Sequence, residues 1–175
     1  MKINIRRLEP HDDRAAFHSG NIDLDRFFAR YAGQNQFRHH IGTTYVAVDE
    51  RGRITGFATV AASELATALL SETKRRRLPA YPIPVLRLAR LAVDELMRGQ
   101  GIAQALLRAV FAVAHKMAAD MGCLGVVVDA KPEAVDFYRK LGFIELRAEA
   151  GLLGDRPQPL PMFLELGAIP KPGGE

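Results

Sequence analysis

The chain has 175 residues, of which 48% are hydrophobic and 25% charged, a composition typical of a folded protein and not of a disordered one. Its length predicts one domain over residues 1–166 and a flexible tail over 167–175, where glycine and proline accumulate. The N-terminal segment shows no apolar signal-like run, and no stretch of about 18 apolar residues predicts a membrane span. Cys123 is the single cysteine, which excludes an intramolecular disulfide, and its apolar neighbours predict a buried thiol. We therefore expect a cytoplasmic protein.

The formal net charge is +4 and the isoelectric point is near 9.5, a mild excess that favours a polyanionic partner without requiring one. Part of this charge is concentrated in residues 74–77, which are four basic residues in a row. Such a run is typical of a solvated helix end, but it also suits contact with phosphates. Both interpretations stay open.

Apolar periodicity and turn residues predict the elements of the N-terminal half: a strand at 2–8, a helix capped by Asn21 that ends near Gly33 or a few residues beyond, and antiparallel strands at 43–48 and 54–61. Residues 64–72 favour a helix. The prolines at 79, 82 and 84 then predict exposed, extended chain before a strand at 85–93, because proline removes a backbone donor.

A long helix is predicted next, because apolar residues recur at steps of three and four from Ile102 to Met117. We expect it to end near Met121, before Gly122. The remaining predicted elements are a strand at 124–128, a helix from Pro132 to Leu141, and strands at 143–147 and 162–166.

The segment from Leu88 to Leu106 joins a strand to a glycine-bounded turn and then to this long helix. The first turn of a helix has four N–H groups without intrahelical partners and the positive end of the helix dipole, so the junction suits a phosphate. Gly99 and Gly101 lack a Cβ, which lets a ligand approach the chain closely. Two glycines also suffice to shape a tight turn, so this interpretation stays beside the first.

Two common phosphate motifs do not fit the junction. A P-loop needs Lys followed by Ser or Thr after its last glycine, whereas Ile102 and Ala103 follow Gly101. A dinucleotide fingerprint beginning at Gly99 would need a third glycine where Gln104 stands.

Residues 98–103, Arg-Gly-Gln-Gly-Ile-Ala, resemble the R/Q-x-x-G-x-G/A loop with which GNAT acetyltransferases hold the pyrophosphate of acetyl-CoA. Residues 134–143 are similar to the A-x-x-x-Y-x-K-x-G-F element of the same family. The resemblance implies a mixed α/β fold, the GNAT acyltransferase fold, in which a twisted, mostly antiparallel sheet has helices on both faces and is splayed near Val93 to admit acetyl-CoA. It also implies the following cofactor-binding residues: Leu91, Ala92, Val93, Arg98, Gly99, Gln100, Gly101, Ile102, Ala103 and Phe137.

A narrower resemblance is to the GNAT-type toxins of bacterial toxin–antitoxin pairs, which acetylate the amino group of aminoacyl-tRNA and so block translation. Four stretches between about residues 8 and 166 carry it: 17–35, 79–84, 90–93 and 128–138. It implies aminoacyl-tRNA as the acceptor, a ribbon-helix-helix antitoxin as a partner and no metal cofactor. The oligomeric state stays open, with a homodimer as one alternative. Lys131 departs from the wider family, where asparagine often holds the cofactor, and this leaves a side-chain contact there in doubt.

The chemistry of acetyl transfer assigns roles to several of these residues. Attack of an amine on a thioester places negative charge on the carbonyl oxygen and releases a thiolate. Tyr138 is the predicted catalytic residue, because its phenol stays protonated at pH 7 and can donate to the sulfur, although a core aromatic is the alternative. The resemblance implies the backbone N–H near Val93 as oxyanion donor and Arg98 as a positive charge beside the pyrophosphate. The predicted substrate contacts are a track of arginines for tRNA phosphates: Arg75, Arg76, Arg77, Arg87 and Arg90.

No side chain stands out as a general base, because His39, His40 and His115 fit surface positions better than catalytic ones. An α-amino group with a pKa near 8 is roughly one-tenth unprotonated at neutral pH, whereas lysine, near 10.4, is almost wholly protonated. The missing base therefore favours an α-amine acceptor. Two alternatives stay open: a GNAT enzyme for a small-molecule or protein amine, and a noncatalytic module that binds CoA or a partner.

Overall fold

The computed structural model describes residues 2–146, 159–169 and 171. Its strands are β1 (Asn4–Arg7), β2 (Thr43–Val48), β3 (Ile54–Leu65), β4 (Ile83–Val93), β5 (Gly125–Ala130), β6 (Ile144–Glu145) and β7 (Leu160–Glu165). Its helices are α1 (Ile22–Arg30), α2 (Ala32–Phe37), α3 (Glu72–Arg75), α4 (Ile102–Asp120) and α5 (Val135–Lys140). Short 3-10 helices are η1 (Thr67–Leu69), η2 (Glu95–Met97), η3 (Pro132–Ala134) and η4 (Leu166–Ala168).

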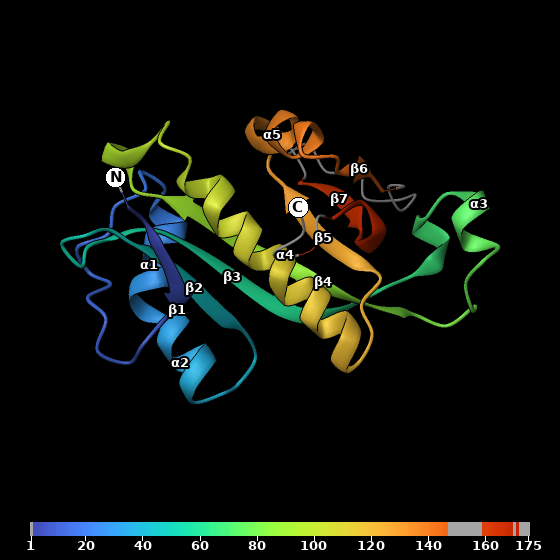
Figure 1. Ribbon diagram of the computed structural model, residues 1–175, viewed down its shortest axis with the longest axis horizontal. Coiled ribbons are helices and arrows are strands. Elements are labelled where there is room, and N and C mark those ends of the chain that lie inside the picture. The colour runs from blue at the N-terminus through green and yellow to red at the C-terminus, as the bar shows by residue number, and fades with distance from the viewer. Residues whose placement is uncertain (1, 147–158, 170, 172–175) are drawn as a thin grey trace. The chain divides into compact units, whose positions relative to one another are not determined.

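The strands form one seven-stranded sheet in the order β1-β2-β3-β4-β5-β7-β6. Together with the helices, this confirms the predicted mixed α/β fold with a mostly antiparallel sheet (Figure 1). The chain divides into two compact units, one of Met1–Ala61 with Leu88–Val110 and one of Ala62–Arg87 with Phe111–Glu175.

In the first unit, β1, β2 and β3 pair antiparallel, and Val46 lies opposite Phe57. The helix cap is as predicted, because the side chain of Asn21 accepts a hydrogen bond from the N–H of Leu24 at 3.0 Å. The prediction of one continuous helix is wrong, since α1 ends at Arg30 and α2 starts after Tyr31.

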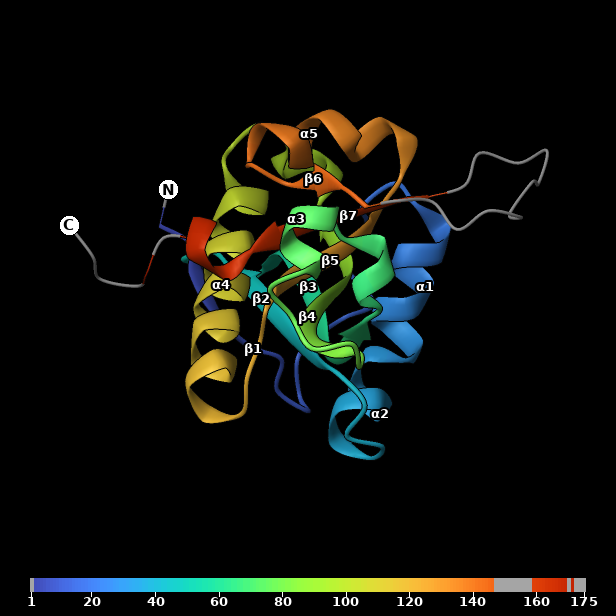
Figure 2. The same ribbon diagram turned by 90° about the vertical axis from the view of Figure 1, so that its right-hand side faces the viewer.

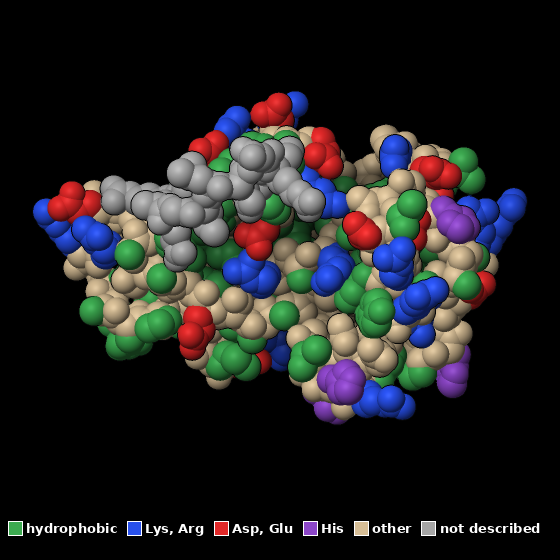
Figure 3. All heavy atoms as spheres, turned by 180° about the vertical axis from the view of Figure 1, so that it is seen from behind, with side chains coloured by type: hydrophobic (Ala, Val, Ile, Leu, Met, Phe, Trp, Pro, Cys, Tyr) green, Lys and Arg blue, Asp and Glu red, His purple; other side chains and the backbone are tan. Residues whose placement is uncertain are grey.

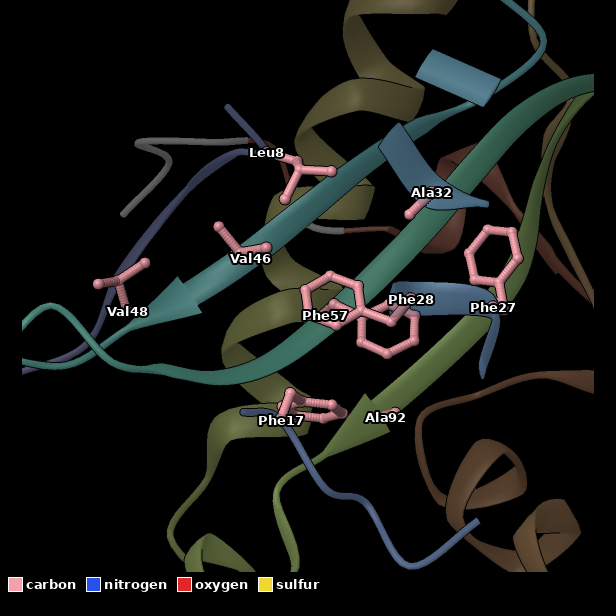
Figure 4. Close-up of a cluster of buried hydrophobic side chains, with 9 residues drawn as sticks. All are labelled: Leu8, Phe17, Phe27, Phe28, Ala32, Val46, Val48, Phe57 and Ala92. Atoms are coloured by element: carbon pink, nitrogen blue, oxygen red, sulfur yellow. The ribbon is translucent and has the colours of Figure 1, made fainter. Parts of the chain in front are cut away.

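An aromatic cluster forms the core of the first unit (Figure 4). The rings of Phe28 and Phe57 stack with centroids 4.4 Å apart and planes 5° apart, and Phe17 meets both rings edge-on. Offset or edge-on contacts of this kind add about 0.5–1.5 kcal/mol per pair beyond the area they bury. The cluster therefore fixes α1 against β3.

The two faces of β3 in this unit serve different helices. Side chains alternate along a strand, so Phe57 faces α1 while its neighbour Gly56 faces the other way. A Cβ at Gly56 would lie 2.9 Å from the side chain of Ile102 and 3.0 Å from that of Leu106. The glycine therefore lets the start of α4 approach the sheet, and Figure 2 shows α1 and α4 on opposite sides of these strands.

The second unit is built around β5, which pairs antiparallel with β7 so that Val127 lies opposite Phe163. A Cβ at Gly125 would lie 2.1 Å from the carbonyl oxygen of Leu164, so this position admits only glycine. Lys74 of α3 lies 5.7 Å from the ring centroid of Phe163 and forms an ion pair with Glu165 at 3.1 Å. A second apolar cluster fills this unit: Leu65, Leu70, Val85, Val127, Leu146 and Phe163.

The length of helix α4 and its mean hydropathy of 1.3 would be sufficient for a membrane-spanning helix. A core helix passes the same test, and the face of α4 that recurs every three to four residues is buried: Ile102, Leu106, Val110, Ala114 and Met117. One face of α4 is therefore packed inside the protein.

Several element boundaries differ from the predictions. Residues 64–72 are not one helix, because β3 continues to Leu65 and the helical residues are divided between η1 and α3. Strand β4 begins at Ile83 and includes Pro84, whose carbonyl accepts from the N–H of Leu124 at 2.9 Å, so the proline is tolerated through its acceptor.

The C-terminal predictions are tested only in part. Of the strand predicted at 143–147, residues 144 and 145 form β6, whereas 147 and the Gly/Pro-rich loop up to 158 lie outside the described residues. In the predicted tail, residues 167 and 168 belong to η4 and Ile169 is buried, while 170 and 172–175 lie outside the described residues. The domain boundary at 166 stays a prediction.

Candidate active site

The junction between β4 and α4 has the backbone that the glycines were expected to permit. Gly99 and Gly101 have φ of +78° and +79°, a left-handed conformation that costs other residues about 1–2 kcal/mol. A Cβ built on either glycine meets nothing within 4 Å. The glycines are thus required by the turn, and they also leave open space beside the first turn of α4.

This open space lies where a helix offers N–H groups to an anion. Helix α4 begins at Ile102. The N–H of Ala105 donates the first hydrogen bond of this helix, to the carbonyl oxygen of Gly101 at 3.1 Å. The N–H groups before Ala105 are therefore the ones that a helix leaves without intrahelical partners. The arrangement fits a phosphate or pyrophosphate group, because helix N-termini bind such anions.

Asp94 anchors the junction, a role that the motif analysis missed. The residue is 7% exposed, its N–H donates to the carbonyl of Thr55 at 2.8 Å, and its carboxylate accepts from the N–H of Leu96 at 3.0 Å. It is the N-cap of η2, and an aspartate directly before a short helical turn is the sequence signal that could have found it.

Arg98 is held by the segment that precedes α1. Its Nη2 donates to the carbonyl of Ser19 at 2.6 Å, and the hydroxyl of buried Ser19 lies 2.6 Å from Asp25. A Cβ at Gly20, where φ is +89°, would lie 3.2 Å from the same Arg98 nitrogen. Residues 19 and 20 are thereby tied to the junction, and the contact of Arg98 with a pyrophosphate stays a prediction.

The other predicted cofactor residues of the first unit follow the chain through this junction. Ala92 is buried, and Leu91 and Val93 on either side of it are half-buried. Gln100 is exposed on the turn, Ile102 is buried, and Ala103 is half-buried on the first turn of α4. Their contacts with a cofactor stay predictions.

Tyr138 lies in the second unit, on α5, with its ring in an aromatic group. Its ring centroid is 5.2 Å from that of half-buried Phe137 and 5.3 Å from that of Phe143, both edge-on. Burial raises the pKa of Tyr138 to about 12, so the phenol is neutral across the physiological range.

Tyr138 is almost wholly buried, with 5% of the residue exposed, and its contact with a ligand stays a prediction.

The predicted substrate arginines fall into different environments. Arg87 pairs with Asp129 at 2.8 Å, and Arg76 pairs with Glu72 at 2.6 Å. Arg75 and Arg77 are exposed on the solvent side of α3 and just after it. Arg90 belongs to the first unit, and its guanidinium carbon lies 3.8 Å from the ring centroid of Phe27. Figure 3 shows Lys and Arg side chains spread among Asp and Glu over one face rather than gathered into one block.

The remaining candidates have structural surroundings. His39 and His40 are exposed after α2, and His115 is half-buried, with Nε2 lying 3.0 Å from the carbonyl oxygen of Ile169. Cys123 is buried as predicted, and burial raises the pKa of its thiol. Lys131 is exposed. Among the described residues, the contacts of these five side chains do not identify any of them as a general base.

Comparison with known proteins identifies the enzyme family that these residues resemble. A family described as "Acetyltransferase (GNAT) domain" matches residues 40–145. The chain is 32% identical over 139 residues to a tRNA-acetylating toxin of Mycobacterium tuberculosis, a match that covers 79% of this chain and 82% of the relative.

Two solved structures extend the likeness over nearly the whole fold. AtaT complexed with acetyl-methionyl-tRNAfMet matches with a TM-score of 0.82 at 26% identity and covers 96% of this chain and 97% of that one. AtaTR bound with acetyl-CoA matches with a TM-score of 0.75 at 26% identity and covers 95% of both chains. These findings confirm the predicted fold and the predicted acetyl-CoA-dependent acetyltransferase. The chain belongs to the GNAT acetyltransferase family.

Proposed function

We propose that this GNAT enzyme moves the acetyl group of acetyl-CoA to the α-amino group of an aminoacyl-tRNA and so blocks translation. The observation that carries the acceptor is the similarity over 79% of the chain to a tRNA-acetylating toxin. The likeness to AtaT complexed with acetyl-methionyl-tRNAfMet supports the same acceptor.

The residues of the β4–α4 junction fit the cosubstrate. The N–H groups of the first turn of α4, with Gly99 and Gly101 open beside them, would hold the pyrophosphate, and Arg98 would add positive charge. Along β4, the backbone of residues 91–93 would bind the pantetheine arm, and the N–H near Val93 would donate to the carbonyl oxygen. Acetyl-CoA supplies an acetyl group activated as a thioester.

The pKa of Tyr138 decides what kind of donor this residue is. The pKa of about 12 lies roughly 3.5 units above the pKa near 8.5 of an ordinary thiol, so full proton transfer to a departing thiolate is unfavourable. A hydrogen bond from the neutral phenol to the sulfur avoids that cost and still stabilises the developing negative charge. We therefore assign Tyr138 as a hydrogen-bond donor to the leaving sulfur.

The acceptor is an amine that needs little help from a base. His39 and His40 are exposed, and His115 lies against the carbonyl oxygen of Ile169, so none of these three is assigned as a base for an amine. An α-amino group, with a pKa near 8, supplies an unprotonated fraction of roughly one-tenth at neutral pH without such help. This chemistry favours aminoacyl-tRNA over a lysine side chain.

The proposed partners follow from the proposed activity. A translation-blocking enzyme needs an inhibitor in the same cell, and we propose a ribbon-helix-helix antitoxin for this role. Both the tRNA and the antitoxin place the protein in the cytoplasm. A homodimer stays a proposal, which a measurement of the molecular mass in solution would test.

The test compares wild-type protein with Tyr138→Phe in cell-free translation supplied with acetyl-CoA. Wild-type protein should block translation, and the variant should be slower in acetyl transfer by on the order of 10²-fold, because it lacks the donor hydroxyl. The phenylalanine ring keeps the contacts with Phe137 and Phe143, so the fold should be unchanged by circular dichroism.

Tyr45→Phe, at a half-buried position of β2, is the matched control and should block translation as wild type does. An equally active Tyr138→Phe would remove Tyr138 from the mechanism. Translation that continues with wild-type protein would overturn the tRNA acceptor, and turnover on a small-molecule or protein amine would then replace it.

A further inference from the structure

A small cavity in the first unit contains a charged side chain that the acetyl-transfer chemistry does not use. The cavity has a volume of about 200 Å³, and its lining includes Phe27, Asn35, Ile41, Thr44, Thr59 and Arg90. These residues come from α1, α2, the segment before β2, and strands β2, β3 and β4. The volume is below the 300–1,000 Å³ typical of drug-sized ligand sites, so the cavity suits one part of a larger ligand.

The guanidinium of Arg90 is placed as a ligand-binding group. Its flat face covers the ring of Phe27, with the guanidinium carbon 3.8 Å from the ring centroid. Stacking occupies the face of an arginine and leaves its N–H donors, which lie in the plane of the group, for another partner.

No carboxylate of the described residues compensates this charge. Arg90 takes part in none of the ion pairs there, and burial alone lowers its pKa. By contrast, Arg6 pairs with Asp12 and Arg87 pairs with Asp129, each at 2.8 Å. A half-buried arginine without such a partner gains most from an anion that arrives with a ligand.

The rest of the lining suits a planar, largely apolar body. Phe27 and Ile41 supply apolar surface, and the hydroxyls of Thr44 and Thr59 satisfy each other at 2.8 Å. The side-chain amide of Asn35 makes no hydrogen bond among the described residues, so it is available to the edge of a ligand. An apolar cavity with one amide and one arginine matches a nucleotide, whose base stacks and bonds along its edge while its phosphate needs a cation.

The position along β4 agrees with this occupant. Arg90 precedes Val93 by three residues, which is about 10 Å along an extended strand. Val93 is the proposed site of the reacting carbonyl, so a terminal nucleotide bound near Arg90 would leave its esterified amino acid within reach of it.

We propose that this cavity binds the 3′-terminal nucleotide of the acceptor tRNA, with the base in the apolar part and the phosphate on Arg90. The assignment rests on the proposed tRNA function and adds the part of the substrate that the cavity recognises. Arg90 thereby contacts the substrate away from the reacting atoms and contributes to binding specificity.

The kinetic test uses two acceptors that carry the same amino acid, one as aminoacyl-tRNA and the other as a simple amide without a nucleotide. Arg90→Gln should lower kcat/KM for aminoacyl-tRNA by about 10- to 100-fold, the range of a lost hydrogen bond to a charged group. It should leave kcat/KM for the amide unchanged. Arg90→Lys keeps the charge without the planar fork and should recover only part of the loss.

Arg51→Gln is the matched control, because Arg51 is an exposed arginine in the turn before β3 and does not line the cavity. It should be equal to wild type on both acceptors. An unchanged rate of Arg90→Gln on aminoacyl-tRNA would overturn the proposal, and so would an equal loss on both acceptors.

A binding measurement separates this proposal from the proposed function. Titration of the trinucleotide CCA should shift the backbone NMR signals of Phe27, Asn35 and Thr44 in wild-type protein and not in Arg90→Gln. If the trinucleotide shifts them while aminoacyl-tRNA is not acetylated, the cavity assignment stands and the proposed function fails. If a peptide with a free carboxylate shifts them and the trinucleotide does not, the nucleotide assignment fails.

Discussion

The side chain of Tyr138 shows how a single environment sets both packing and chemistry. Its ring is fixed by edge-on contacts with Phe137 and Phe143, and only 5% of the residue is exposed. Desolvation of the ring and oxygen raises the pKa to about 12, because burial disfavours the phenolate. The same burial therefore keeps the proton on the donor and makes complete transfer of that proton costly.

This pKa predicts the pH dependence of acetyl transfer. A group with a raised pKa keeps its proton as the pH rises, so Tyr138 remains a donor throughout the range below about 12. The rate should rise about tenfold per pH unit while the acceptor α-amine loses its proton, level off above about pH 8, and stay level to about pH 10.5.

Initial rates of acetyl transfer to an amino-acid amide between pH 6 and 10.5 provide the measurement. Tyr138→Phe should be slower at every pH with the same profile shape. A fall of the wild-type rate centred near pH 10, absent in the variant, would show that the phenol titrates at its ordinary pKa and would contradict the assignment.

At the scale of elements, the β4–α4 junction combines a turn with an anion site. Two glycines at positive φ close the turn, and the N–H groups of the first turn of α4 remain beside open space. The cap at Asp94 and the bond from Arg98 to the carbonyl of Ser19 hold the approach to this turn. The junction is thus shaped by the backbone before any ligand binds.

The chain contains its own control for the role of these glycines. Gly52, in the turn between β2 and β3, has φ of +80° and open space around its Cβ position, as Gly101 does. Gly101→Ala and Gly52→Ala should each lower the free energy of unfolding by about 1–2 kcal/mol in urea, because both place a Cβ at positive φ.

Only Gly101→Ala should weaken acetyl-CoA binding, by about tenfold or more in calorimetric titration, because its methyl group enters the space beside the helix N-terminus. Equal affinities of the two variants would place the pyrophosphate elsewhere.

Sequence patterns predicted the elements whose signals are local. The cap at Asn21 and the glycines at 99 and 101 act on neighbouring residues, so each could be recognised without the fold. The division of the first helix at Tyr31 and the continuation of β3 to Leu65 could not, because packing decides them. The stacking of Arg90 on Phe27 also joins residues far apart in the chain, and alternation along β4 did not show which way Arg90 points.

At the scale of the whole molecule, we propose that a mildly basic GNAT enzyme acts on a polyanionic substrate. A net charge of +4 assists the approach of tRNA without selecting it. Several basic side chains are already paired within the protein, including Arg76 and Arg87, so long-range attraction is modest. Selection must therefore come from local contacts, of which the cavity at Arg90 is the one that we propose.

Acetyl transfer to aminoacyl-tRNA is tested by mass spectrometry of aminoacyl-tRNA after incubation with this protein and isotopically labelled acetyl-CoA. The proposed function predicts one labelled acetyl group on the α-nitrogen of the esterified amino acid, with no label on uncharged tRNA. Label that appears only on protein or small-molecule amines, or no label on any aminoacyl-tRNA, would contradict it.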